Sequence, residues 1–189
     1  FRAAVDLAAP AVLLKAEAIV PTAELPPYFG QGDAAGKECH LAYQSSLMAA
    51  SWYALANQDA GLMNRMVRHF PSMSPDTTWI TYARCHDDIG WNVLKPELLP
   101  DEFNKLRTAS QFFSGTLEDS YARGISFQAS DPQAVHGTNG MLGALTGFHD
   151  TSDEDGFARY RLMTALMFST AGIPMVYMGD EYAQGNNTG

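Results

Sequence analysis

Three adjacent residues with side chains that can transfer protons or bind polar groups, His86, Asp87 and Asp88, follow a run of strand-forming residues. Thr77 to Tyr82 is made up of β-branched and aromatic residues, which favour strands. A strand end with one histidine and two carboxylates can bind a polar substrate, exchange protons with it or stabilise positive charge. The alternative is a polar exit from strand to loop, in which His86 is a hydrogen-bonded core histidine.

A further candidate, Glu17, lies near the end of the apolar run Ala11 to Val20, which stops at Pro21. The length and composition of the run predict a strand buried on both faces. A carboxyl group between Ala16 and Ala18 in such a strand is expected to retain its proton through desolvation, as a general acid must. The alternative is a strand-end glutamate paired with Lys15 or an arginine.

The elements that position these residues alternate between helix and strand. Apolar spacing predicts an amphipathic helical stretch over Leu47 to Phe70, interrupted near Asn57 to Gly61. The other expected elements are the end of a helix at Phe1 to Leu7, a loop around at most one short helix at Pro21 to Gly36, a short strand at Glu38 to Tyr43, a helix at Asp153 to Thr170 and a buried strand at Gly172 to Gly179. Such alternation predicts an α/β fold with a parallel sheet.

Composition excludes several classes of function. The 189 residues are 46% hydrophobic and 17% charged, with a formal net charge of −9, which disfavours nucleic acid and favours an uncharged substrate. The two cysteines, Cys39 and Cys85, lack the spacing of a zinc site. No apolar run is long enough for a membrane span. Because the chain starts at Phe1 rather than Met, we expect a piece of a longer protein, and the compartment and oligomeric state stay open.

Three segments, KAEAIV around Glu17, RCHDDIGW around Asp87 and AGIPMVYMGDE near the chain end, resemble the fifth, seventh and eighth strand regions of the glycoside hydrolase family 13 barrel, the α-amylase clan. With SYARGISFQ at Ser120 to Gln128, they are most similar to the amylosucrase and sucrose hydrolase branch. The resemblance implies the C-terminal half of a (β/α)8 TIM barrel, whose active sites lie at the carboxyl ends of the strands. Its divisions would be barrel residues 1–91, from the fourth helix to the seventh strand, an inserted subdomain at 92–146 and barrel residues 147–189.

The resemblance also implies a retaining mechanism on sucrose or another α-glucoside, with an acceptor sugar or water and without a metal or cofactor. Glu17 matches the general acid/base of the family, and Asp87 matches the carboxylate that stabilises the oxocarbenium-like transition state. Contacts with substrate are implied for four further residues: His86, Asp88, Trp91 and Ile19. Asp88 would contact the acceptor-side sugar, and Trp91 would form a pocket wall.

The chain departs from the family pattern in two places. The nucleophile would lie in an R-x-D-A-V strand, but Asp6 has no arginine two residues before it and sits on a helical pattern. We therefore expect this chain to be inactive alone, and half a barrel to leave two open sheet edges. Where amylosucrases carry an arginine before Ser-Gly-Thr, this chain has Gln133 to Thr138, which argues against polymer synthesis. His136 could replace the lost donor, although a surface loop histidine is the simpler interpretation.

Two alternatives come from other classes of protein. A metal-dependent phosphohydrolase could use His86 and Asp87 as ligands, but His40, His69, His136 and His149 lack helical ligand pairing. A non-catalytic barrel module could retain the fold without its chemistry. Asp180 and Glu181 could close a pocket or bind neighbouring loops, and Trp52 and Trp79 lie on element patterns typical of core residues.

Overall fold

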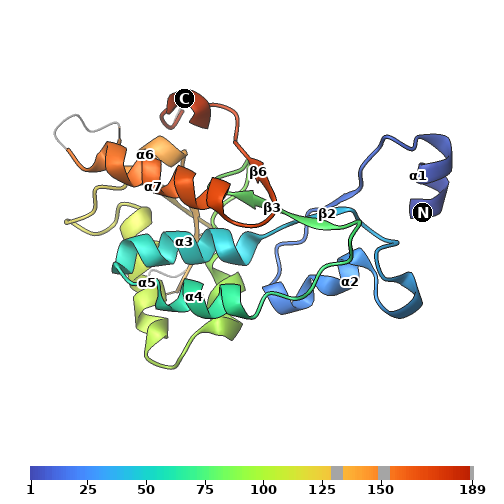
Figure 1. Cartoon of the computed structure of the whole chain (residues 1–189). Coiled ribbons are helices and arrows are strands. Elements are labelled where there is room, and N and C mark those ends of the chain that lie inside the picture. Colours follow the sequence, from blue (N-terminus) through green and yellow to red (C-terminus); the bar gives the residue numbers. More distant parts are fainter. Residues whose placement is uncertain (129–133, 149–153, 188–189) are drawn as a thin grey trace.

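A parallel sheet lies at the centre of the computed structural model, which describes residues 1–128, 134–148 and 154–187. Its four strands follow the order β1-β2-β3-β6, and all neighbours are parallel (Figure 1). Their bounds are Lys15–Ala16 for β1, Leu41–Tyr43 for β2, Thr78–Tyr82 for β3 and Ile173–Met175 for β6. The predicted α/β fold with a parallel sheet is confirmed. The residues that follow the four strands therefore lie along one edge of the sheet.

The two outer strands differ from the prediction. Only Lys15 and Ala16 of the run Ala11 to Val20 form β1, and exposure alternates along it, with Ala16 and Ala18 buried and Glu17 exposed. In β6, Ile173 is 47% exposed. The prediction of a strand buried on both faces is wrong for β1, and the prediction of a buried strand is wrong for β6, because both are edge strands that have a neighbour on only one side among the described residues.

The helices on the sheet follow the predicted pattern. α3 (Ser45–Asn57) and α4 (Gly61–Arg68) confirm the predicted interruption, and α3 ends at Gln58, which has a left-handed φ of 52°. α7 (Gly156–Ser169) lies within the predicted helix, whose first residue, Asp153, is outside the described residues. Both α3 and α7 pack on β3. The N-terminal helix is confirmed as α1 (Arg2–Ala8), and the loop after Pro21 holds three short turns: η1 (Thr22–Glu24), α2 (Pro26–Phe29) and η2 (Gly32–Ala34).

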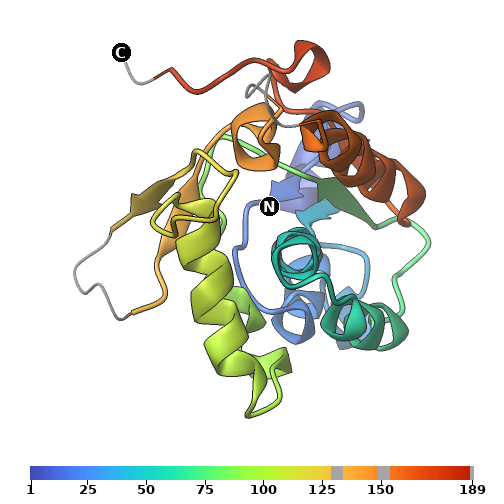
Figure 2. The ribbon, with the colours of Figure 1, turned by 90° about the vertical axis from the view of Figure 1, so that its left-hand side faces the viewer.

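The segment between β3 and α7 adds a helix and a strand pair beside α3. Its elements are η3 (Trp91–Glu97), α5 (Glu102–Phe113), β4 (Ile125–Phe127), the antiparallel β5 (Gly137–Asn139) and α6 (Leu142–Thr146). α5 lies between α3 and the β4–β5 ribbon (Figure 2). Trp52 of α3 meets Phe113 of α5 edge-on at 5.0 Å between ring centroids. One hydrophobic cluster thus continues from the sheet and α3 into this segment.

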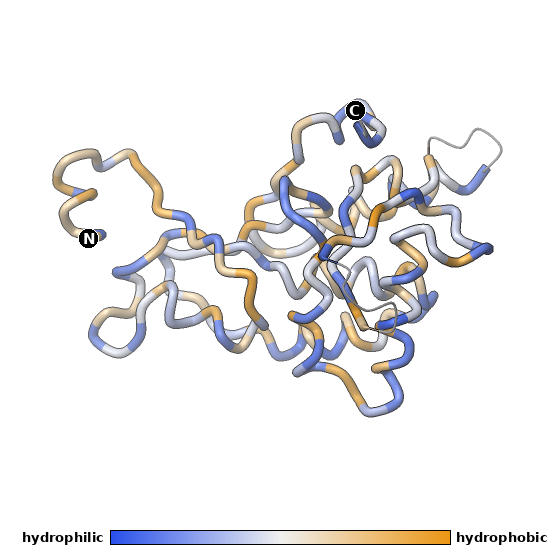
Figure 3. Tube along the Cα trace, turned by 180° about the vertical axis from the view of Figure 1, so that it is seen from behind, coloured by the Kyte–Doolittle hydropathy of each residue, from blue (hydrophilic) through white to orange (hydrophobic). Residues whose placement is uncertain are grey.

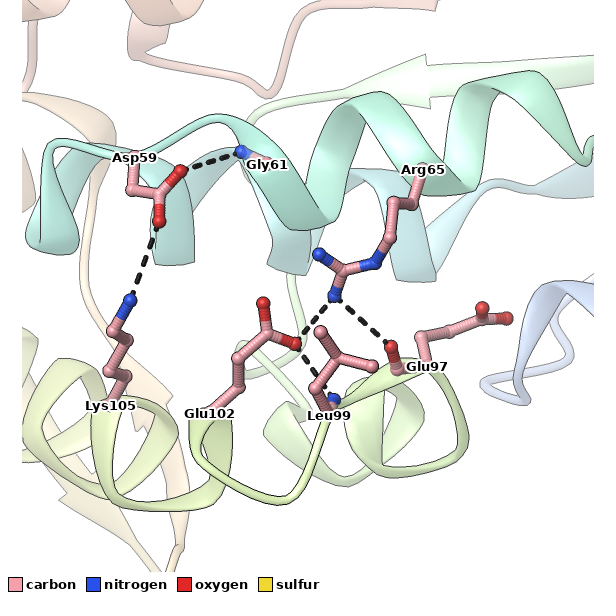
Figure 4. A network of polar contacts seen from close by, with 7 residues as sticks. All are labelled: Asp59, Gly61, Arg65, Glu97, Leu99, Glu102 and Lys105. Atoms are coloured by element: carbon pink, nitrogen blue, oxygen red, sulfur yellow. Dashed lines mark hydrogen bonds and ion pairs between the residues drawn. The ribbon is translucent and has the colours of Figure 1, made fainter.

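A polar network also joins α4 to α5 (Figure 4). The Arg65 guanidinium lies 2.5 Å from Glu102 Oε2, which also accepts a hydrogen bond from the Leu99 backbone N–H at 2.8 Å. Glu102 is only 6% exposed, so its charge is stabilised mainly by these donors. A second pair joins Lys105 of α5 to Asp59 in the turn between α3 and α4 at 3.4 Å, with both side chains about half exposed.

The N-terminal segment extends away from this body. α1 has no buried residue, and hydrophobic residues continue along the segment, as Figure 3 shows. Phe1 is 94% exposed and Leu7 86%. Among the described residues no helix is long and apolar enough to cross a membrane.

Candidate active site

The ends of β1 and β3 meet through a direct contact between two predicted site residues. His86 Nε2 lies 2.9 Å from Glu17 Oε1, and the other carboxylate oxygen of Glu17 lies 3.5 Å from Lys15 Nζ. Lys15 also donates a hydrogen bond to the Tyr43 hydroxyl at 2.7 Å. The structure therefore brings together one carboxylate, one imidazole and one ammonium at the carboxyl edge of the sheet.

The predicted desolvation of Glu17 is not found. Its side chain is 43% exposed, because β1 is an edge strand whose alternation turns Ala16 and Ala18 inward and Lys15 and Glu17 outward. Its neighbours are the basic groups of Lys15 and His86. The strand-end pairing with Lys15 that the sequence left open is present.

Both the side-chain carboxylate and the backbone carbonyl of Asp87 accept hydrogen bonds from its own loop. Its Oδ1 accepts a hydrogen bond from the Asp88 backbone N–H at 2.9 Å, and its carbonyl oxygen accepts one from Arg84 Nη2 at 2.6 Å. The loop thus turns around the buried guanidinium of Arg84. These two bonds fix the direction in which the Asp87 carboxylate leaves the backbone.

Asp88 lies against the β4–β5 ribbon. A Cβ atom at Gly137 would lie 1.7 Å from Asp88 Oδ2, so the absence of a side chain at Gly137 makes room for this carboxyl group. Burial raises the pKa of Asp88, and the neighbouring carboxylate of Asp87 raises it further. Asp88 is therefore protonated more easily than an ordinary aspartate.

A cavity of about 390 Å³ opens beside these residues. His86 and Asp87 line it together with Ile125, Asn139 and Tyr177. Its walls thus come from the loop after β3, the β4–β5 ribbon and the loop after β6. The volume and the mixed polar and apolar walls suit a small polar ligand.

The other predicted site residues do not line this cavity. Ile19 is 39% exposed, and its side chain lies near Gly90. Trp91 is 1% exposed, stacks on Phe113 with ring centroids 6.0 Å apart and donates to the Thr138 hydroxyl. The expectation of Trp91 as a pocket wall is corrected here, because the apolar ring fills the core between α5 and the ribbon and leaves no exposed face.

Arg84 was not singled out as functional from the sequence, and Asp180 was considered there as a pocket-closing or structural residue. Arg84 is 2% exposed, and burial lowers the pKa of its guanidinium, which nevertheless stays protonated near neutrality. Asp180, in η4 (Asp180–Tyr182), is 6% exposed, and burial raises its pKa to about 6. The only signal for Arg84 in the sequence was a charge directly after a buried strand.

Asp180 and Glu181 bind neighbouring backbone. Asp180 Oδ1 accepts a hydrogen bond from Leu142 N–H at 3.3 Å, and Glu181 Oε2 accepts one from Gly179 N–H at 2.7 Å. These bonds are the structural alternative considered above. Within the described residues no group of three histidine, cysteine or acidic side chains could hold a metal ion.

Asp6 and the stretch before β5, the two places where the chain departs from the family pattern, make polar contacts in the structure. Asp6 lies on α1, where its carboxylate pairs with Arg2 at 2.9 Å. Gln133 lies outside the described residues. The carbonyl oxygen of His136 accepts a hydrogen bond from the Ser110 hydroxyl at 3.0 Å, which ties this stretch to α5.

Sequence comparison finds relatives whose alignments cover nearly the whole of this chain, although no family model matches. Glucosylglycerate phosphorylase of Escherichia coli K12 is 29% identical over 177 residues, which cover 94% of this chain and 30% of the relative. Trehalose synthase of Thermus thermophilus is 28% identical over 178 residues, covering 94% and 15%. The resemblance to glycoside hydrolase family 13 is confirmed.

The structural comparison agrees with this relationship. The crystal structure of sucrose 6F-phosphate phosphorylase from Thermoanaerobacter thermosaccharolyticum superposes with a TM-score of 0.69 at 18% identity, over 95% of this chain and 32% of that one. At this identity the match concerns the fold. The chain thus has the α/β fold of part of that structure, and it spans less than a third of the curated relatives described above.

Proposed function

We propose that this chain supplies the second half of the catalytic barrel of a retaining α-glucosyl hydrolase or transferase. In this proposal residues 92–146 are the subdomain inserted after the seventh strand. The substrate is sucrose or a related α-glucoside, and the acceptor is a sugar or water. The nucleophile comes from a part of the longer protein outside these residues.

The contact between His86 Nε2 and Glu17 Oε1 carries the proposal. It joins two residues that are 69 positions apart (86 − 17) and follow different strands of one parallel sheet. Active sites of (β/α)8 barrels are built from residues at the carboxyl ends of several strands. A polar strand exit without function gives no reason for a carboxylate and an imidazole from two strands to converge.

The chemistry divides among the residues in this way. Glu17 protonates the departing glycosidic oxygen and later removes a proton from the acceptor, as retaining enzymes require. Asp87, fixed by the backbone of its own loop, presents a negative charge to the sugar ring as positive charge develops there. Asp88 contacts the acceptor-side sugar.

The contact with Glu17 also constrains His86. A given imidazole nitrogen is either a donor or an acceptor, and Nε2 already uses its one position toward Glu17. If His86 binds a glucosyl hydroxyl through this nitrogen, it must leave Glu17 at the same time. Substrate binding would then free the Glu17 carboxyl group, which gives its proton to the departing oxygen in the acid form and takes a proton from the acceptor as the carboxylate.

Substitution of Glu17 tests the proposal in the full-length protein. We expect Glu17→Gln to abolish turnover of sucrose, because an amide cannot transfer the proton, while the far-ultraviolet circular dichroism stays unchanged. Glu24→Gln, at an exposed glutamate of η1, is the matched control. Unchanged turnover in Glu17→Gln would contradict the assignment.

A second candidate function, phosphorolysis, is favoured by two of the similar proteins, the glucosylglycerate phosphorylase and the sucrose 6F-phosphate phosphorylase. Inorganic phosphate would then replace water or sugar as the acceptor of the glucosyl group. Incubation of the full-length protein with sucrose, with and without phosphate, separates the two: glucose 1-phosphate indicates phosphorolysis, and free glucose or glucosides indicate hydrolysis or transfer.

The isolated 189-residue chain is expected to have no activity. Its described residues contain Glu17 and Asp87 but no aspartate in the R-x-D-A-V setting of the nucleophile. Turnover by the isolated chain that Glu17→Gln abolishes would show that a residue within the chain serves as nucleophile.

A further inference from the structure

Arg84 is a buried charge that touches both sides of the cavity floor. Its Nε donates to the Gly140 carbonyl oxygen at 2.7 Å, and its Nη2 donates to the Asp87 carbonyl oxygen at 2.6 Å. Nη1 is buried and has no hydrogen-bond partner among the described residues. Burying a guanidinium is costly unless it is hydrogen-bonded or paired with an opposite charge.

The Gly140 contact extends this arrangement to the loop after β6. The next two backbone N–H groups bind that loop: Met141 N–H donates to Asn186 Oδ1 at 2.8 Å, and Leu142 N–H donates to Asp180 Oδ1 at 3.3 Å. Arg84 therefore connects the loop that bears Asp87 to the segment that anchors the opposite wall.

Two carboxyl groups, Asp88 and Asp180, act electrostatically on Arg84, but it forms no direct ion pair with either in the described part of the chain. Its bonds go to backbone carbonyl groups instead. A lysine could keep the positive charge but could not reach two carbonyls in the fixed geometry of the guanidinium fork.

We propose that Arg84 is a positioning residue that sets the direction of the Asp87 carboxylate. The inference rests on the proposed function, in which Asp87 stabilises the transition state. Arg84 lines the cavity but is only 2% exposed, with its Nε and Nη2 engaged by backbone carbonyl groups; it acts by holding the Asp87 backbone. A displaced Asp87 weakens transition-state stabilisation more than it weakens binding of the substrate.

The test compares Arg84→Met, Arg84→Lys and Asp87→Asn in the full-length protein, with steady-state kinetics on sucrose. We expect Arg84→Met to lower kcat by about 10-fold to 100-fold while KM changes by less than about threefold. Arg84→Lys should recover only part of kcat, because charge alone does not restore the second carbonyl contact. Arg68→Met, at an exposed arginine of α4, is the control and should match the wild-type protein.

Each outcome decides a separate point. If Asp87→Asn loses activity but folded Arg84→Met or Arg84→Lys keeps wild-type kcat, the positioning role is overturned and the proposed function stands. If Asp87→Asn keeps wild-type activity, the role proposed for Asp87 is itself wrong. A rise in KM with unchanged kcat, or failure of both Arg84 variants to fold, also overturns the inference, since either result assigns Arg84 to binding or to general stability.

Discussion

Trp91 donates a hydrogen bond from its indole Nε1 to the Thr138 hydroxyl oxygen at 2.9 Å. Thr138 is fully buried and also pairs with Ile89 through backbone hydrogen bonds in both directions, at 2.9 and 3.3 Å. The loop that follows β3 and the β4–β5 ribbon are therefore fixed to each other directly beside Asp88. The ribbon is part of the wall around the proposed site.

Thr138→Val should destabilise the protein by about 1–3 kcal/mol, because it leaves the buried Trp91 N–H without an acceptor. Urea unfolding followed by tryptophan fluorescence measures the effect. Adding Trp91→Phe removes the unpaired donor, so the double variant should lose less than the sum of the single losses. Thr108→Val, at an exposed threonine of α5, should cost less than about 0.5 kcal/mol.

Glu102→Leu should destabilise the protein by about 1–3 kcal/mol, because it leaves the Leu99 N–H without an acceptor and Arg65, which is 38% exposed, without its partner. Lys105→Met breaks the neighbouring exposed pair with Asp59 and should cost no more than about 1 kcal/mol. Equal losses in thermal or urea unfolding would show that burial does not distinguish the two pairs.

Asp180 should make the folded state less stable as the pH rises from about 4 to about 6. Burial raises the pKa of Asp180 in the folded protein from 3.8 to about 6, so in this window the folded state binds more protons than the unfolded state. Asp180→Asn lacks this titration, and its stability relative to the wild-type protein should increase between pH 4 and pH 6 and then level off. Urea unfolding of both proteins across this range measures the difference; a constant difference would exclude the raised pKa.

Gly137→Ala should act through Asp88. The added methyl group occupies the position of the Asp88 carboxyl oxygens, so the side chain must rotate away. If Asp88 binds the acceptor, the ratio of transfer to hydrolysis on sucrose should change in the same direction as in Asp88→Ala. In an Asp88→Ala background, Gly137→Ala should change the ratio no further; an additional change there would mean that the ribbon acts on the reaction independently of Asp88.

The part of the fold that could be predicted is the part that local pattern controls. The β-branched and aromatic residues before His86 predicted β3, and the apolar spacing of Leu47 to Phe70 predicted both α3 and α4 with the break between them. Propensity and periodicity act over a few residues, so a single sequence contains them. Burial of the outer strands could not be predicted in the same way, because an apolar run does not reveal whether a neighbouring strand exists on both sides.

By itself, the sequence determined which residues can do chemistry and that Glu17 and Asp87 follow strands of one parallel sheet. Only the tertiary structure decided which of them touch. In the tertiary structure His86 contacts Glu17, Arg84 donates a hydrogen bond to the Asp87 carbonyl oxygen, and Trp91 is buried against Phe113. Arg84 meets Gly140 across 56 residues of chain, and such contacts depend on how helices and strands pack against one another, which no local pattern encodes.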